Sequence, residues 1–262
     1  MVAAAKLRRA QEAAVSGRPY SDRFDSVMSG LTASMGVDSG PPLLIGTGAD
    51  TNHLLIVMTA ERGLCGGFNS NIAKLAKLKA SKLISEGKSV KILTVGKKGR
   101  DSLKREFGKY FVGHVDLTEM KGASYSYAVE VASNILNRFD SSEFDVATIY
   151  YSQFESVMSQ IPTEKQLIPP VFQASTESTA YDYEPSEEEI LIDLLPQSIT
   201  AQIFRALLEN GASEQGARMS AMDSATRNAG EMIDKLIIQY NRSRQAVITN
   251  ELIEIISGAE AL

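Results

Sequence analysis

The chain has 262 residues, a formal net charge of -5 at pH 7 and a single cysteine, Cys65. This acidic balance leaves no excess of Lys and Arg to neutralise a phosphate backbone, which argues against a dedicated nucleic-acid binder. One cysteine excludes an intrachain disulfide, and His53 and His114 lie too far from it in the sequence to suggest a zinc site. No apolar run reaches the roughly 18 to 20 residues that a membrane-spanning helix needs.

Residues 1–36 predict a helix. Small and apolar side chains recur at helical steps as far as Met35, and Pro19 predicts a kink. The segment Met1–Arg9 lacks the apolar core of a secretory signal. It is rich in Arg and Ala, as mitochondrial transit peptides are, but a basic helix face is the simpler interpretation. Glycines and prolines crowd into residues 39–48, which predicts a loop and a boundary.

Residues 50–172 predict an α/β domain, because strand-like and helix-like segments alternate. The expected strands are 54–59, 90–95, 110–115 and 146–151, and the expected helices are 69–86, 100–107 and 125–139. This order predicts a Rossmann-like, mainly parallel sheet with helices on both faces. Gln166–Ile168, which precede two prolines, are a candidate edge strand.

Residues 173–195 predict an acidic connector, because Ser175–Leu195 contain no Lys or Arg. From Pro196 onward there is no further proline, and residues 196–262 predict one long helix. At 1.5 Å per residue such a helix measures about 90 Å, roughly twice the width of the middle domain. It is therefore too long to pack wholly on that domain.

Apolar residues recur along this helix at steps of three and four, which indicates a coiled-coil type of seam. The seam comprises Ile199, Ile203, Leu207, Met222, Ala225, Ala229, Ile233, Leu236, Tyr240, Val247, Leu252 and Ile256. The N-terminal segment is the remaining helical segment outside the middle domain, so an antiparallel pair of terminal helices is expected. Gly211, Gly216 and Gly230 each cost roughly 1 kcal/mol relative to alanine, and with Ala221 they suggest a slender rod inside a close-fitting sleeve.

The segment RGLCGGFNSNIAK, Arg62–Lys74, places a glycine-rich turn between a strand and a helix, where backbone N–H groups attract anions. It contains neither GxGxxG nor GxxxxGK[ST], so both common phosphate-binding patterns are missing. Tight-turn glycines, with Asn69 or Ser70 capping the next helix, are the better interpretation.

The same reasoning predicts no catalytic group, cofactor or metal site. Cys65 has no histidine near it in the sequence and is expected to be a small, partly buried thiol. Glu251 and Glu254 lie one turn apart on a helix, where surface charge is the ordinary interpretation.

Residues Ala217–Asn228 and Val247–Leu262 resemble the C-terminal stretch of ATP synthase gamma subunits. The closing signature of that family is matched by Ile248, Thr249, Glu251, Glu254, Gly258 and Ala259. RGLCGGFN resembles the family's segment after its first strand, and MVAAAKLRRAQ with Arg18, Pro19 and Tyr20 resembles its N-terminal helix. The resemblance therefore covers nearly the whole chain.

The resemblance implies a non-catalytic subunit that forms the central shaft of a proton-translocating F-type ATP synthase. Its paired terminal helices are then expected inside a ring of alpha and beta subunits, with the α/β domain at the foot on the epsilon subunit and the membrane c-ring. The expected location is the cytoplasmic face of a bacterial plasma membrane, with the matrix side of the mitochondrial inner membrane as the alternative.

By the same resemblance, Arg244, Gln245, Thr249 and Glu251 match positions that touch catch loops of the beta subunits. Tyr183 and Glu184 match a segment that faces the rotor ring and epsilon. Family members carry further residues before the position of Met1, so the N-terminal helix is expected to lack its first turns and to leave part of the seam exposed.

Two alternatives stay open at this point. One is a nucleotide-dependent enzyme that uses the turn Gly63–Asn69, and the other is an unrelated coiled-coil scaffold.

Overall fold

The computed structural model describes residues 2–35, 40–118, 124–171 and 187–260. Contacts divide the chain into two compact units, Met1–Ser220 (unit 1) and Ala221–Leu262 (unit 2), which are described separately. Within the described ranges, no helix combines the length and the apolar character that crossing a membrane requires.

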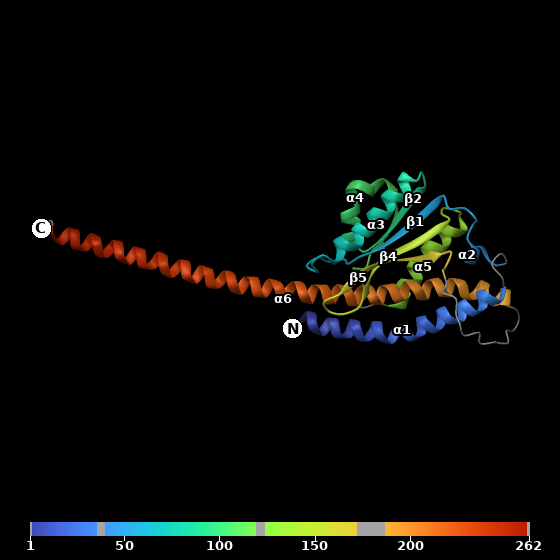
Figure 1. Ribbon diagram of the computed structural model, residues 1–262, viewed down its shortest axis with the longest axis horizontal. Helices are drawn as coiled ribbons and strands as arrows, with labels where there is room; N and C mark the ends of the chain where they lie inside the picture. Colours follow the sequence, from blue (N-terminus) through green and yellow to red (C-terminus); the bar gives the residue numbers. More distant parts are fainter. Residues whose placement is uncertain (1, 36–39, 119–123, 172–186, 261–262) are drawn as a thin grey trace. The chain divides into compact units, whose positions relative to one another are not determined.

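The elements follow one another largely as the alternation predicts (Figure 1). The helices are α1 (Val2–Met35), α2 (Pro42–Ile45), α3 (Phe68–Ser85), α4 (Lys97–Phe107), α5 (Tyr125–Asp140) and α6 (Glu187–Glu260), with a 3-10 turn at Gly108–Tyr110. The strands are β1 (Asn52–Met58), β2 (Ser89–Val95), β3 (Phe111–Val115), β4 (Val146–Phe154) and β5 (Gln160–Ile168).

The strands form one sheet in the order β3-β2-β1-β4-β5. The first four are parallel, and β5 runs antiparallel to β4 at the edge. The mainly parallel sheet between terminal helices is thus confirmed. The candidate edge strand is also present, but it begins at Gln160 and is longer than Gln166–Ile168.

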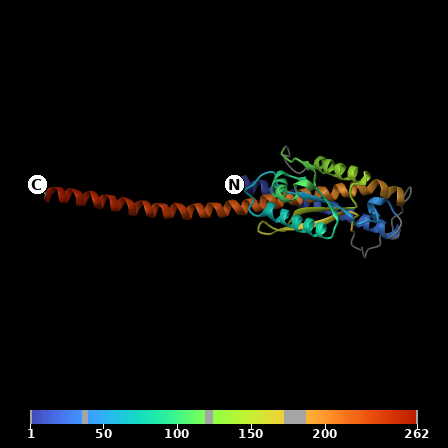
Figure 2. The same ribbon diagram turned by 90° about the horizontal axis from the view of Figure 1, so that it is seen from above.

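Helices cover both faces of the sheet, and Figure 2 shows α3 and α5 on opposite sides of it. On one face, α3 and α4 pack against alternate residues of the inner strands, such as Leu55 and Val57. On the other face, α5 and the first part of α6 pack against Leu54 and Ile56. Alternation along β1 therefore sends successive side chains into two separate cores.

The first part of the predicted seam does not face α1. Ile199, Ile203 and Leu207 are buried against the sheet together with α5. The reason is that the apolar area of this sheet face is covered by α5 and α6 together, so α6 must turn its widest apolar stripe toward the strands. The expectation that these residues meet the N-terminal helix is wrong.

Helix α1 packs on a neighbouring face of α6 and runs antiparallel to it, as expected. Leu7 and Ala14 near the start of α1 cluster with Leu208 and Ala212. Near the end of α1, Met28 and Leu31 cluster with residues from the beginning of α6. The two helices approach closely in between, because a Cβ on Gly17 would lie 2.7 Å from Leu208 Cδ1.

Helix α6 begins at Glu187 rather than at Pro196, so Ile190–Leu195 belong to the helix and not to a connector. Leu191 and Leu195 are buried in one cluster with Met28, and this packing supports the helical turns that precede the proline. Packing has thus outweighed the local cost of Pro196.

Candidate functional site

Strand β4 extends beyond the end of its pairing with β1. The last residues of β4 therefore have no strand partner on the β1 side. Pairing between β1 and β4 ends at Val57 and Tyr150, whereas pairing between β4 and β5 continues to Phe154. On the β1 side, the backbone groups of Ser152 and Phe154 therefore need other partners, since buried N–H and C=O groups are almost always bonded.

Side chains of α6 and α1 supply these partners. Asn210 Oδ1 accepts from the Ser152 N–H at 3.1 Å, and the Ser213 hydroxyl donates to the Ser152 carbonyl at 3.0 Å. Two residues further along β4, Glu209 Oε2 accepts from the Phe154 N–H at 2.9 Å, and Arg18 Nη2 donates to the Phe154 carbonyl at 2.8 Å. Polar side chains thus bond this edge as another strand would. We call Arg18, Glu209, Asn210 and Ser213 the polar clamp.

Arg18 and Glu209 also bond each other through two parallel contacts. Arg18 Nε donates to Glu209 Oε1 at 2.7 Å, and Arg18 Nη2 donates to Glu209 Oε2 at 3.1 Å. The Glu209 side chain is 1% exposed and that of Arg18 is 35% exposed. The hydrogen bond to Glu209 raises the pKa of Arg18, so the guanidinium stays charged. One buried carboxylate therefore joins α1, α6 and β4.

A second ion pair joins the same two helices without reaching the sheet. Arg205 Nη1 lies 2.6 Å from Asp22 Oδ1, and the Asp22 side chain is 62% exposed. Exposed pairs of this kind contribute about 0–1 kcal/mol. The pair is therefore a natural comparison for the clamp.

The glycine-rich turn is held from within the chain. Leu64 and Gly66 have positive φ values of 64° and 55°. The N-cap of α3 is Gly67, without a side-chain hydrogen bond, so the expected cap by Asn69 or Ser70 is wrong. Asn69 instead bonds across the turn, accepting from the Ala60 N–H at 2.9 Å and donating to Cys65 Sγ at 3.1 Å.

Helix α6 packs where a nucleotide would have to bind. Doubly wound sheets bind ligands in the crevice beyond the carboxyl ends of their strands. Here Ala217 packs in the same cluster as Cys65, and Arg218, paired with Glu214 at 2.6 Å, donates to the Gly63 carbonyl. Burial raises the pKa of the Cys65 thiol, which disfavours the reactive thiolate. The glycine-rich turn thus forms a packing surface for α6 of the same chain.

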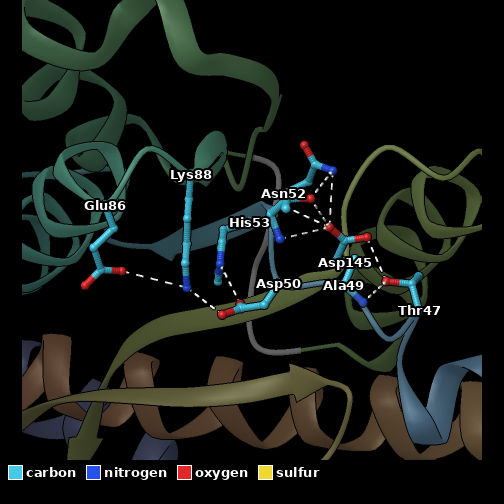
Figure 3. A network of polar contacts seen from close by, with 9 residues as sticks. Thr47, Ala49, Asp50, Asn52, His53, Glu86, Lys88 and Asp145 are labelled. Atoms are coloured by element: carbon cyan, nitrogen blue, oxygen red, sulfur yellow. Dashed lines mark hydrogen bonds and ion pairs between the residues drawn. The ribbon is translucent and has the colours of Figure 1, made fainter.

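A second polar network lies at the opposite, amino end of the strands (Figure 3). Asp145, which precedes β4, accepts from the Thr47 hydroxyl at 2.7 Å and from the Asn52 N–H at 2.9 Å, and it also accepts from Thr51. Burial tends to raise the pKa of Asp145, but these hydrogen bonds outweigh it and lower the value to about 2. The network ties the loop before β1 to the start of β4.

A separate group of ion pairs centres on Asp50, beside the Asp145 network (Figure 3). Lys88 donates to Asp50, whose pKa it lowers, and His53 Nε2 lies 2.9 Å from the other carboxylate oxygen. Burial lowers the pKa of His53 despite this carboxylate. A cavity of about 510 Å³ adjoins these residues, and its lysines, Lys79, Lys82 and Lys88, each lie within 4 Å of a carboxylate. The lysines are thus already paired, and the cavity is no evident anion site.

Unit 2 carries the residues matched to the catch-loop contacts. Arg244, Gln245, Thr249 and Glu251 are all exposed, and the Thr249 hydroxyl donates to the Gln245 carbonyl at 2.8 Å. From Met222 to Ala259 every side chain is exposed, large apolar ones included. The large apolar ones are Met222, Met232, Ile233, Leu236, Ile237, Ile238, Tyr240, Val247, Ile248, Leu252, Ile253, Ile255 and Ile256. Tyr183 and Glu184 lie outside the described residues.

Sequence reasoning missed both polar networks. The sequence points to Arg18 only through the family resemblance, and it does not single out Glu209 or Asn210. Their signal is a pair of polar residues beside Ala206–Leu208 in an otherwise apolar stretch of helix. Buried polar side chains of this kind need partners, so such a pair indicates bonds to another element.

Comparison with known proteins gives a consistent result along the whole chain. The profile of a family described as ATP synthase matches residues 1–262. The chain is 68% identical over 265 residues to the ATP synthase gamma chain of Dinoroseobacter shibae, with 100% of this chain and 91% of the relative covered. It is 70% identical over 266 residues to the gamma chain of Ruegeria sp., with the same coverage.

Solved structures share the fold. A chain of the Euglena gracilis mitochondrial ATP synthase matches with a TM-score of 0.63 and 20% identity, covering 98% of this chain and 95% of that one. A chain of the Tetrahymena thermophila mitochondrial ATP synthase central stalk and c-ring matches with a TM-score of 0.62 and 22% identity, covering 86% and 100%.

Proposed function

The chain belongs to the gamma-chain family of F-type ATP synthases, and from this premise we propose how it works as the central shaft. It is the central-stalk subunit, and catalysis in the complex resides in the beta subunits. The finer proposal is that unit 2 turns inside a ring of alpha and beta subunits, while the sheet domain rests with the epsilon subunit on the membrane c-ring.

The uncovered helix of unit 2 is the observation that carries this proposal. Its apolar side chains, such as Ile233, Leu236 and Ile253, are more than half exposed. Apolar surface of this extent normally marks a site of protein contact. A ring of partner subunits would cover it on all sides, which suits a helix with apolar residues all around.

A rotating shaft can act only if it contacts different states of its partners differently. Each orientation must favour one beta conformation over another, because a contact that is equal in all states shifts no population. An asymmetric set of polar groups on the helix would provide this difference. We propose Arg244, Gln245, Thr249 and Glu251 for this role, since Arg and Gln side chains offer several donors to acidic loops.

The proposal also includes the foot and the location. Tyr183 and Glu184 are proposed to face epsilon and the c-ring, and the complex is proposed to lie on the cytoplasmic face of a bacterial plasma membrane. The bacterial sources of the relatives support this location. Cysteines placed at 183 or 184 should crosslink to epsilon or to the c-ring in membranes, and their failure to do so would argue against this part.

Reconstitution tests the central proposal. Alpha and beta subunits assembled with this chain should hydrolyse ATP in the multisite mode much faster than the same subunits without it. Equal rates with and without the chain would refute the shaft function.

A second arm of the same experiment tests the catch-loop residues. Arg244→Glu should lower the multisite rate, because it reverses the charge that faces an acidic loop. Arg242→Glu is the matched control, since residues two positions apart on a helix point to different sides. Equal losses in both variants would show that charge alone, rather than position 244, is responsible.

A further inference from the structure

We propose that the polar clamp is the joint that carries torque between the sheet domain and α6, with Arg18 and Glu209 as its positioning residues. The proposal rests on the shaft function above and adds the place at which turning force passes between elements of unit 1. It follows from the difference between directional and non-directional contacts.

Apolar packing alone resists rolling of a helix weakly. The contacts of Ile203 and Leu208 with their neighbours are non-directional, because the hydrophobic effect depends on the area removed from water. A hydrogen bond, in contrast, weakens steeply when its angle changes. The bonds of α6 to the backbone of β4 therefore fix both the rotation and the axial position of the helix.

The clamp is attached to a rigid part of the sheet. Ser152 and Phe154 belong to β4, an inner strand whose other edge is paired with β5 throughout this stretch. Their backbone groups can move only with the strand. A turning force on α6 would thus load the sheet directly through Glu209, Asn210 and Ser213.

Arg18 extends the joint to α1. Its guanidinium bonds the Glu209 carboxylate and the Phe154 carbonyl at the same time, so neither helix can shift without breaking a bond to the strand. Lysine could not replace this fork, because a single ammonium on a flexible stem lacks the planar geometry. The Arg205 pair with Asp22 joins only the two helices and makes no bond to β4.

The burial of the pair favours a positioning role over a stabilising one. A buried ion pair is often no more stabilising than apolar residues of similar volume, yet it demands one geometry. The Glu209 side chain, which is 1% exposed, has that demand met on both oxygens. A contact that transmits torque requires the two helices and the strand to keep one relative position. A hydrophobic core can be stable without that requirement.

The experiment uses the complete ATP synthase in vesicles, carrying Glu209→Gln, Arg18→Lys or the control Arg205→Met. ATP hydrolysis and ATP-driven proton pumping are measured together against an increasing opposing gradient. For both clamp variants we expect hydrolysis within about twofold of the unmodified complex, but a pumping-to-hydrolysis ratio that falls severalfold as the gradient rises. The control should keep the ratio at every gradient.

Amide exchange in the same complexes reports the joint itself. The Ser152 and Phe154 amides should exchange about tenfold faster in the clamp variants, which corresponds to easier local opening. A role in folding alone would lower hydrolysis and pumping in proportion and leave their ratio unchanged.

Two results would overturn the proposal. One is an unchanged ratio in both clamp variants, and the other is an equal fall in the Arg205→Met control, since any contact between α1 and α6 would then serve. Neither result would contradict the proposed shaft function. That function would be refuted separately if multisite hydrolysis did not require the unmodified chain.

Discussion

Helix α6 passes through two contrasting surroundings along one continuous run of residues. Between Leu191 and Ala217 it is buried against α1, α5 and the sheet, and even polar residues such as Glu209 and Ser213 have bonded partners. From Met222 onward every described side chain is exposed up to Ala259. The same secondary structure is therefore specified by tertiary contacts in unit 1 and by local preference in unit 2.

The contrast teaches that helical periodicity does not identify a partner. The step of three and four that begins at Ile199 continues to Ile256, yet its first residues face the sheet and its last ones have no cover within unit 2. In unit 1 the chain provides its own partner. In unit 2 the described residues leave the helix exposed, and the partner subunits proposed above would cover it.

Matched isoleucines on α6 give the largest expected difference. Ile203 is 0% exposed and Ile233 is 56% exposed. Ile203→Ala should lower the free energy of unfolding by about 3 kcal/mol, because it leaves a cavity against the sheet. Ile233→Ala should change it by less than about 0.5 kcal/mol.

Urea unfolding of the full chain measures this difference. Near-UV circular dichroism follows unit 1 through the buried Tyr150 and Tyr151, and far-UV circular dichroism follows all helices. Equal effects of the two substitutions would break the comparison, since they would mean that unit 2 also buries its apolar residues within the chain.

Asp145 gives a smaller effect that is confined to unit 1 and depends on pH. Its pKa of about 2 lies below the ordinary value of 3.8, because hydrogen bonds from Thr47, Asn52 and Thr51 outweigh the effect of burial. A lowered pKa stabilises the fold above pH ~4, and this contribution is lost as the pH falls from about 4 to 2. The shift corresponds to about 2 kcal/mol.

Asp145→Asn should therefore lower the free energy of unfolding by about 2 kcal/mol at pH 7 and flatten its decline between about pH 4 and 2. Unfolding curves of both proteins at several pH values, followed by the tyrosine signal, check the prediction. Parallel pH profiles would show that Asp145 is not the group that titrates in this range.

Much of the fold could be predicted because it follows local patterns. The spacing of apolar residues differs between the strand Leu54–Thr59 and the helix that follows it. The repeated alternation of such strands and helices predicts a parallel sheet. Strand β5 was underestimated because it is an edge strand with a proline, Pro162, and charged residues, which weaken the period-two signal. The start of α6 at Glu187 differs from the expected start at Pro196, because a proline preceded by glutamates is typical of a connector.

The clamp could not be predicted, because its bonds depend on how distant elements cross. Arg18 and Glu209 are 191 positions apart in the sequence. Their meeting requires α1, α6 and the end of β4 to lie at one point, and it requires β4 to be longer than β1. Sequence patterns predict which face of a helix or strand is buried, but they do not predict where one strand extends beyond its neighbour.

The smallest expected effect concerns Gly230 in unit 2. A Cβ at this position would meet nothing within 4 Å. Gly230→Ala should therefore stabilise the helix locally by about 1 kcal/mol, and nearby amides of the isolated chain should exchange about fivefold more slowly.

Gly216→Ala is the matched control in unit 1, because its Cβ would lie 3.4 Å from Phe154 and Gln160 and these side chains would have to accommodate it. Its gain should be smaller for that reason. Slower exchange in Gly230→Ala alone would mean that Gly230 lowers the stability of the helix and that no contact within the chain offsets this loss. Such a glycine is expected where a neighbouring subunit lies close to the helix backbone. No change in Gly230→Ala would mean instead that helix propensity does not limit local order in unit 2, and the contrast between the two parts of α6 would have to be explained differently.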